Sequence, residues 1–149
     1  MASLDKEIKS KFSSPQQKAH INIIYTHNWL TNKSSTIFKE YGITMQQYNV
    51  LRILKGSHPE TKTPTDVKAV MLDKNPDLTR LIDRLVKKNL VNREDSKINR
   101  RQVNLSITEE GIKHINQISP KIDLENNLIN QLSDQEAETL SHLLDKLRG

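Results

Sequence analysis

The chain has 149 residues, enough for one domain with its own hydrophobic core and too few for two domains of ordinary size. Hydrophobic residues make up 34% of the chain and aromatic residues 4%, which is lean for a monomer, so we expect apolar surface to be shared between subunits. Cysteine is absent, which excludes disulfides, thiolate metal sites and a thiol-based redox switch within this chain.

The formal net charge of +5 is concentrated in one part of the chain. Residues 74–101 hold nine Lys or Arg and four Asp or Glu, so this segment alone carries a net charge of +5 and the rest is neutral. Localised positive charge favours a polyanionic partner, although such a segment can also be a solvated surface. No apolar run approaches the ~20 residues that a membrane helix needs, and the first residues lack the apolar centre of a signal peptide. We therefore expect a soluble, cytoplasmic protein without a membrane partner.

Two helices are predicted in the first part of the chain. Residues 3–12 are expected to form a short helix that ends at the sequence SSP. Pro15 suits the first position of a longer helix, in which apolar residues keep a helical spacing as far as Gly42, a natural helix end.

Capping signals begin the next two helices. Thr44 and Gln47 have the spacing of a capping box and predict a helix that ends at Gly56. After a polar loop, Thr63 suits an N-cap with Asp66 three residues later, which predicts a short helix.

A tight turn leads to another helix, for which we predict Asn75 as the N-cap and Pro76 as the first residue. This helix is expected to end at Asn89, a residue that tolerates the left-handed conformation. Its inward stripe comprises Leu78, Leu81, Ile82 and Leu85. Its outward residues are Asp77, Thr79, Arg80, Asp83, Arg84, Lys87 and Lys88.

A hairpin follows this helix. Residues 90–95 and 100–107 have the pattern of two strands around a loop at 96–99. In the second strand, apolar and polar residues alternate, so one face of the strand is expected to be buried.

Two further helices complete the chain. Thr108 is predicted to cap a long helix that runs to about residue 131 and is interrupted or kinked near Pro120. Ser133 and Glu136 form another capping box, which begins the last helix. The predicted fold class is therefore mainly α with a small β-hairpin.

A short helix, a tight turn, a second helix and a hairpin with a basic tip follow one another in the order of a winged helix-turn-helix. In such a unit the second helix can enter the major groove of DNA. Arg80, near the start of that helix, can make a bidentate contact to guanine or hold a phosphate, and the sequence does not choose between them. Arg80 and Arg84 can also pair with Asp77 or Asp83 and only decorate the surface.

Three short motifs carry a family resemblance. Leu-Thr-Arg opens the second helix of this unit, Leu-Val-Asn-Arg leads into the hairpin, and Thr-Glu-Glu-Gly follows it. With the helices upstream, this order resembles the multiple antibiotic resistance regulator (MarR) family over residues 20–149. The resemblance implies a winged helix-turn-helix transcription regulator, a repressor or an activator, that binds near-palindromic double-stranded DNA as a homodimer.

The resemblance also implies roles for segments and residues. A single domain, 1–149, would combine dimerisation helices at 15–42 and 109–149 with a winged helix-turn-helix at 44–108. The expected DNA contacts of the recognition helix are Pro76, Asp77, Thr79, Arg80 and, from its outward position, Arg84. In the wing, Arg101 matches the arginine of the family, and Lys97 and Arg100 are expected to assist it.

Two positions depart from the family pattern. Asn99 stands where the family usually has Asp, which weakens an ion pair that would orient the wing arginine. Asn89 stands where the family usually has Gly, and the left-handed conformation tolerates this change.

Four aromatic residues are candidates for a ligand site. Tyr25, Trp29 and Tyr48, together with Tyr41, could line a cavity between the dimer helices and the DNA-binding part. MarR-like proteins often bind small aromatic effectors there. Packing in the core or at an interface is the alternative role of these residues.

Enzymatic chemistry has no support in the sequence. A Gly-rich phosphate loop, a nucleophile motif and a set of neighbouring His and carboxylate residues are all missing, so we expect neither an enzyme nor a cofactor. His20 and His27, seven residues apart, would bind a metal only with a third ligand from elsewhere, and no metal site is predicted. The alternative to DNA binding is a winged-helix module whose basic face contacts an acidic protein partner.

Overall fold

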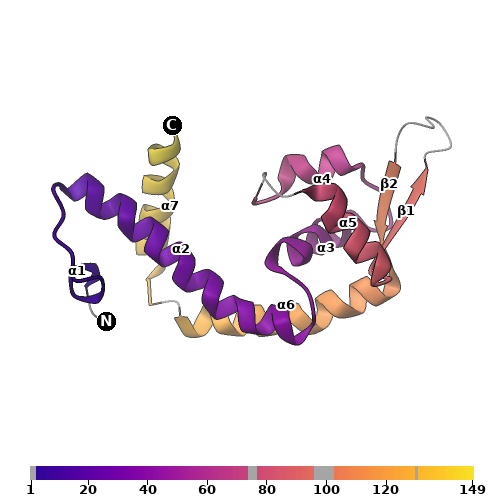
Figure 1. The fold of residues 1–149 in the computed structure, drawn as a ribbon, viewed down its shortest axis with the longest axis horizontal. Coiled ribbons are helices and arrows are strands. Elements are labelled where there is room, and N and C mark those ends of the chain that lie inside the picture. The colour runs from indigo at the N-terminus through magenta and orange to yellow at the C-terminus, as the bar shows by residue number, and fades with distance from the viewer. Residues whose placement is uncertain (1–2, 74–76, 96–102, 130) are drawn as a thin grey trace.

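The computed structural model describes residues 3–73, 77–95, 103–129 and 131–149 (Figure 1). In chain order the elements are α1 (Leu4–Glu7), α2 (Pro15–Glu40), α3 (Met45–Ser57), α4 (Pro64–Val70), α5 (Leu78–Lys87), β1 (Val91–Asp95), β2 (Val103–Ile107), α6 (Glu109–Ile129) and α7 (Asp134–Arg148). This is the mainly α fold with a small β-hairpin that the sequence predicts. Within the described ranges, no helix is both long enough and apolar enough to cross a membrane.

Capping pairs fix the starts of several helices, as predicted. In each capping box a serine or threonine hydroxyl accepts the N–H of the residue three positions later, and that residue's side chain accepts the N–H of the N-cap. The three boxes are Thr44 with Gln47 at α3, Thr63 with Asp66 at α4, and Ser133 with Glu136 at α7. Pro15 is the first residue of α2, and Ser14 caps this helix by accepting the N–H of Gln17 at 3.1 Å.

Two predicted helix ends are wrong. Helix α1 stops at Glu7 instead of residue 12, and Lys9 beyond it has a left-handed φ of 48°, which a right-handed helix does not contain. Helix α3 continues through Gly56 to Ser57. A glycine ends a helix where it takes a positive φ, and Gly56 does not, whereas Gly42 after α2 has a φ of 65°.

The predicted interruption of the long C-terminal helix at Pro120 is also wrong. Helix α6 runs through this residue as one element. The proline removes one backbone donor, but Ile118 and Ile122 on either side of it are buried and hold both halves of the helix on the same core. Tertiary packing therefore outweighs the local signal.

Helix α5 starts later than predicted. Its N-cap is Asp77, whose Oδ1 accepts the N–H of Arg80 at 3.2 Å. The predicted cap, Asn75, and the predicted first residue, Pro76, lie outside the described residues. The predicted end is confirmed, because Asn89 has a left-handed φ of 56°.

The core lies between α3, α4, α5, the hairpin and α6. Helix α3 is its centre, with Val50, Leu51 and Leu54 almost completely buried. Packed around them are Val67 from α4, Leu81, Ile82 and Leu85 from α5, Leu105 and Ile107 from β2, and Ile115 and Ile118 from α6. The inward stripe predicted for α5 is thus confirmed, with Leu78 partly buried at its edge.

The hairpin is antiparallel, and its register pairs Val91 with Ile107 and Asp95 with Val103. A third segment joins it, because Lys62 exchanges two backbone hydrogen bonds with Leu105, of 2.9 and 2.8 Å. The loop before α4 is therefore fixed to β2, the second strand of the hairpin that follows α5.

The two ends of the molecule differ in packing. Figure 1 shows the hairpin and helices α3, α4 and α5 at one end, and α1, the start of α2 and α7 at the other, with α2 and α6 between them. Helix α2 packs on α6, and Asp5 of α1 forms an ion pair with Lys18 of α2. Helix α7 buries none of its residues in this chain.

The close contact of α6 with the hairpin predicts that alanine substitution has opposite effects on stability at Gly111 and at Gly56. A methyl group at Gly111 would lie 2.3 Å from the carbonyl oxygen of Leu90 and 2.7 Å from a side-chain carbon of Ile107, whereas one at Gly56 meets nothing within 4 Å. Gly111→Ala should lower the free energy of unfolding by about 1–3 kcal/mol through overpacking. Gly56→Ala is the matched control and should raise it by about 0.5–1 kcal/mol, because alanine is the better helix former. Urea titrations measure both, and equal effects would contradict the close approach.

Candidate nucleic-acid interface

The helix-turn-helix is built from α4 and α5, whose inner faces are fixed by the core. Val67 and Met71 anchor the first helix and the residue after it. Leu81, Ile82 and Leu85 anchor the second. Because the apolar stripe of α5 is buried, the rotation of this helix is set, and its opposite face must point to solvent.

Cationic side chains occupy that outer face. Arg80, Arg84, Lys87 and Lys88 are all exposed, as is Thr79 in the first turn. Asp77, immediately before the helix, is exposed as well, and Asp83 is half-buried. Six of the seven outward positions predicted for α5 are therefore confirmed as exposed, and four of them carry a positive charge.

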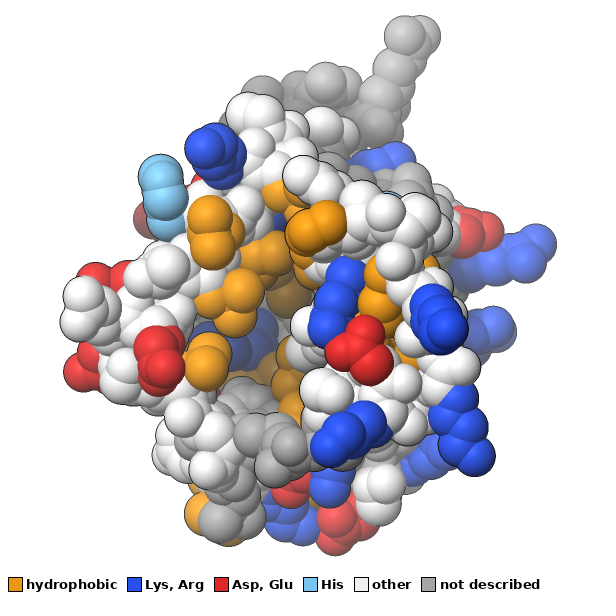
Figure 2. Space-filling view, turned by 90° about the vertical axis from the view of Figure 1, so that its left-hand side faces the viewer, with side chains coloured by type: hydrophobic (Ala, Val, Ile, Leu, Met, Phe, Trp, Pro, Cys, Tyr) orange, Lys and Arg blue, Asp and Glu red, His pale blue; other side chains and the backbone are white. Residues whose placement is uncertain are grey.

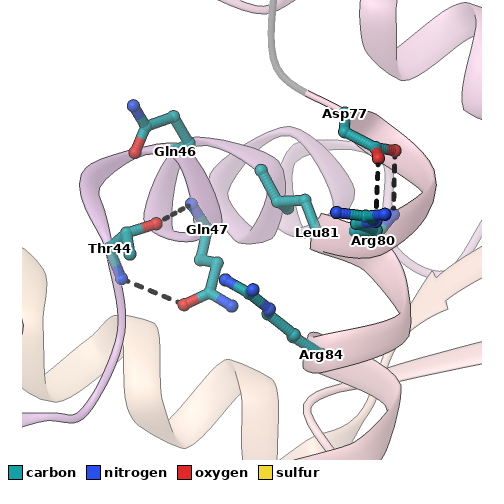
Figure 3. A pocket seen from close by; sticks show the side chains of 7 residues that line it. All are labelled: Thr44, Gln46, Gln47, Asp77, Arg80, Leu81 and Arg84. Atoms are coloured by element: carbon teal, nitrogen blue, oxygen red, sulfur yellow. Dashed lines mark hydrogen bonds and ion pairs between the residues drawn. The ribbon is translucent and has the colours of Figure 1, made fainter.

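The start of α5 carries an ion pair that the sequence offered only as an alternative. The Nε of Arg80 lies 3.2 Å from Oδ2 of Asp77, while the other carboxylate oxygen of Asp77 caps the helix (Figure 3). The Arg80 side chain is still 80% exposed and that of Asp77 58% exposed. The Asp77 carboxylate thus holds both the first turn of α5 and the side chain of Arg80, which projects from that turn.

A groove separates α5 from the start of α3. It has a volume of about 250 Å³ and is lined by Thr44, Gln46, Gln47, Asp77, Arg80, Leu81 and Arg84. Figure 3 shows the Arg84 side chain extending across the groove toward Gln47, whereas Arg80 turns back to Asp77. Arg84 forms no ion pair with any residue that the structure describes. The capping box predicted the start of α3, but no local pattern could place it beside α5.

A second ion pair connects α5 to the hairpin. Asp83 Oδ1 accepts a hydrogen bond of 2.9 Å from Nη1 of Arg93 on β1. The sequence suggested Asp83 as a partner for Arg80 or Arg84, and the structure corrects this assignment. The correction could not come from helical spacing, because the strand that carries Arg93 turns back beside the helix only after the bend at Asn89.

That bend is held from the far side of the hairpin. The Thr108 hydroxyl donates to the carbonyl oxygen of Asn89 at 2.7 Å and accepts the N–H of Gly111 at 2.9 Å. The predicted cap of α6 is thus confirmed, and the same side chain ties the end of α5 to the start of α6. The recognition-helix candidate is therefore fixed at its end as well as along its buried face.

The predicted wing residues lie outside the described residues. They are Lys97, Arg100 and Arg101, with Asn99 between them. Pro76, at the predicted start of the recognition helix, is also outside. Their contributions to the interface stay predictions.

The four aromatic candidates lie in different surroundings. Tyr48 belongs to the core, with its ring 5.1 Å from that of Phe38 and its hydroxyl 2.9 Å from Ser119 Oγ. Tyr41 is half-buried and packs on the edge of His114. Tyr25 is exposed on α2.

Of these residues, Trp29 lies on an open groove of about 520 Å³, together with Asn32, Lys33, Thr36, Ile37 and Glu125. Tyr25 and Tyr48 do not line it. An effector pocket shared by Tyr25, Trp29 and Tyr48 therefore stays a prediction.

Metal ligands do not gather in the described part of the chain. No group of three His, Asp or Glu residues is placed to hold an ion within the ranges that the structure describes. His20 and His27 are both exposed on α2.

Comparison with known proteins supports a regulatory role for this architecture. The transcriptional regulator PapX of Escherichia coli, of the helix-turn-helix type, is 30% identical over 90 residues, which are 60% of this chain and 55% of PapX. The chain thus spans about half the length of that relative. The MarR transcription factor from Planctomyces limnophilus has 30% identity and a TM-score of 0.70, covering 93% of this chain and 98% of the other. A mutant MarR from Escherichia coli, solved in complex with operator DNA, has 26% identity and a TM-score of 0.73, covering 98% and 99%.

The fold and the exposed, basic α5 define a winged helix-turn-helix transcription regulator of the MarR type, as the sequence motifs imply. The family model described as transcriptional regulator SarA/Rot matches residues 32–118, more than half of the chain. The chain belongs to this family of transcriptional regulators.

The start of α4 predicts a pH-dependent term in stability. Asp66 accepts hydrogen bonds from the hydroxyl and the N–H of Thr63, at 2.7 and 2.9 Å, and these bonds hold the pKa of Asp66 below its ordinary value of 3.8. Because the pKa is lower in the folded state, Asp66 stabilises the folded chain above the ordinary value, and this stabilisation is lost as the pH falls through the lower, folded pKa.

We therefore expect Asp66→Asn to unfold at lower urea concentration than the unmodified chain at about pH 6, and the difference to shrink toward about pH 3. Urea titrations across this range measure it. A difference that stays constant at every pH would show that the carboxylate charge does not contribute.

Proposed function

We propose that the chain binds double-stranded DNA sequence-specifically as a homodimer, with α5 as the recognition helix on a near-palindromic operator. The observation that carries this proposal is the exposed cationic face of α5, held in place by the burial of Leu81, Ile82 and Leu85 on the opposite face. A mutant MarR of Escherichia coli, 26% identical, has been solved with operator DNA, which supports the same partner here.

The proposed binding geometry follows from the dimensions of DNA. The major groove admits an α-helix, and the N-terminal residues of a recognition helix reach the base edges. Thr79 and Arg80 occupy this position in α5, while Arg84, Lys87 and Lys88 follow toward the backbone. Two such helices in a symmetric dimer would lie about one helical turn apart, ~34–36 Å, and the wings would contact the flanking DNA.

The homodimer is supported by the apolar surface at the other end of the molecule. Helix α7 buries no residue, and an isolated helix of 15 residues is only marginally stable in water. Its exposed leucines are Leu140, Leu143 and Leu147, and the exposed apolar residues of α2 are Ile23, Ile24, Tyr25, Trp29 and Leu30. Figure 2 views this end of the molecule and shows hydrophobic side chains gathered around a hollow. We propose that the same helices of a second copy fill it, so that α2, α6 and α7 form the dimerisation part and residues 44–108 the DNA-binding part.

DNA binding is tested by selecting bound sites from random duplex DNA and then titrating salt on the recovered site. We expect a two-fold symmetric motif and an affinity that falls steeply as salt rises. Arg84→Ala should flatten the slope of log K against log salt by about one unit per subunit if Arg84 contacts a phosphate.

Arg148→Ala is the matched control, because it removes the same charge from α7, at the opposite end of the molecule from α5 (Figure 1), and should leave the slope unchanged. If no duplex is bound even at low salt, DNA binding is wrong, and the basic face is then better explained by an acidic protein partner.

The dimer interface is tested by placing a charge in the apolar stripe of α7. Leu143→Glu should shift the protein from dimer to monomer, because a carboxylate buried in an apolar contact loses its hydration without gaining a partner. Ser141→Glu adds the same charge to the same helix outside that stripe and should leave the dimer intact. Sedimentation velocity gives the mass in solution. A Leu143→Glu protein that stays dimeric would exclude this face from the interface.

A further inference from the structure

The carboxylate of Asp77 makes two different contacts with the same residue. Oδ1 accepts the backbone N–H of Arg80 at 3.2 Å, and Oδ2 lies 3.2 Å from its Nε. The first contact caps α5, and the second restrains the direction in which the guanidinium leaves the helix (Figure 3). An arginine side chain is otherwise among the most rotamer-rich, so the restraint removes much of its freedom before any ligand arrives.

Fold stability does not account for this ion pair. Both side chains are more than half exposed, and exposed pairs between neighbouring turns contribute little to stability because water and salt screen them. The cap itself needs only an oxygen that accepts an N–H, which Asn or Ser would supply equally well. The negative charge of Asp77 is therefore not needed for the cap, and its effect falls on the Arg80 side chain.

The geometry leaves one edge of the guanidinium available. A guanidinium donates from Nε and from the two terminal nitrogens. Nε is the guanidinium nitrogen that lies beside Asp77 Oδ2 in the ion pair, so the pair of terminal nitrogens forms the free edge. That edge matches two acceptors side by side, and in the major groove guanine alone offers such a pair, O6 and N7, whereas adenine places a donor beside its N7.

Asp77 also disfavours a contact between Arg80 and the phosphates of the DNA backbone. A carboxylate 3.2 Å from the guanidinium makes the pair electrically neutral as a unit, and it repels phosphate oxygens. Arg84, one turn further along α5, has no carboxylate partner among the described residues and keeps its full attraction for phosphate. The two arginines of one helix are therefore suited to different ligands.

We infer that Asp77 is a positioning residue that does not itself contact DNA but directs Arg80 to a guanine in each half-site. This inference rests on the proposed DNA binding of α5. It assigns Arg80 to base recognition and Arg84 to the backbone, a choice that the sequence leaves open.

The first test is Asp77→Asn in the full-length chain, which keeps an N-cap acceptor and removes the charge. The selected site should be bound about five- to one-hundredfold less selectively relative to random duplex. Binding to random duplex should at the same time strengthen and become more salt-dependent, because Arg80 is then free to contact phosphate.

Asp145→Asn is the matched control, since Asp145 forms the same kind of pair with an arginine three residues later on α7, away from α5. It should change neither selectivity nor salt dependence. A purely structural role of Asp77 predicts a different result, equal weakening on all sequences, and that result would overturn the inference.

The second test replaces each guanine of the selected site in turn by 7-deazaguanine, which lacks only the N7 acceptor. At one guanine per half-site the unmodified protein should lose affinity, Asp77→Asn should lose less, and Arg80→Ala should be insensitive. If Arg80→Ala stays as sensitive as the unmodified protein at every guanine, Arg80 does not read guanine. Failure to recover any site would instead refute the proposed DNA binding, so the two failures are distinguishable.

Discussion

The burial of one face of α5 is the constraint on which the functional surface depends. Leu81, Ile82 and Leu85 pack against α3, which is itself enclosed by α4, β2 and α6. A helix with three buried positions over two successive turns cannot rotate without exposing them, and each such exposure costs on the order of 1.5–3 kcal/mol. The apolar contacts on the inner face therefore determine the side on which the cationic residues of α5 project.

Much of this arrangement was predictable because the signals that specify it are local. A capping box spans four residues and an apolar stripe repeats every three or four, so both can be identified from sequence alone. This explains why the starts of α3, α4 and α7 and the buried face of α5 were predicted. The left-handed turn at Asn89 belongs to the same class, because a single residue satisfies it.

The errors arise where a distant segment decides. Pro120 is a local signal for interruption, but the buried Ile118 and Ile122 keep α6 continuous. Asp83 pairs with Arg93, and not with Arg80 or Arg84 on its own helix, because the hairpin folds back on α5. The packing of Tyr48 beside Phe38 and Ser119 likewise depends on α2 and α6, which no local pattern places, and its role in an effector pocket stays a prediction.

The division between Arg80 and Arg84 shows how one helix can separate specificity from affinity. Both arginines are exposed and four residues apart, so their intrinsic attraction for DNA is similar. What differs is the ion pairing: the Asp77 carboxylate pairs with Arg80, whereas Arg84, which lines the same groove, forms no ion pair with any described residue. A phosphate contact strengthens binding to every sequence, whereas a restrained guanidinium adds binding only where two acceptors meet it. The negative charge of Asp77 at the start of a cationic helix therefore weakens the attraction of Arg80 for phosphate. The same charge restrains Arg80, so that its contact with a base becomes selective.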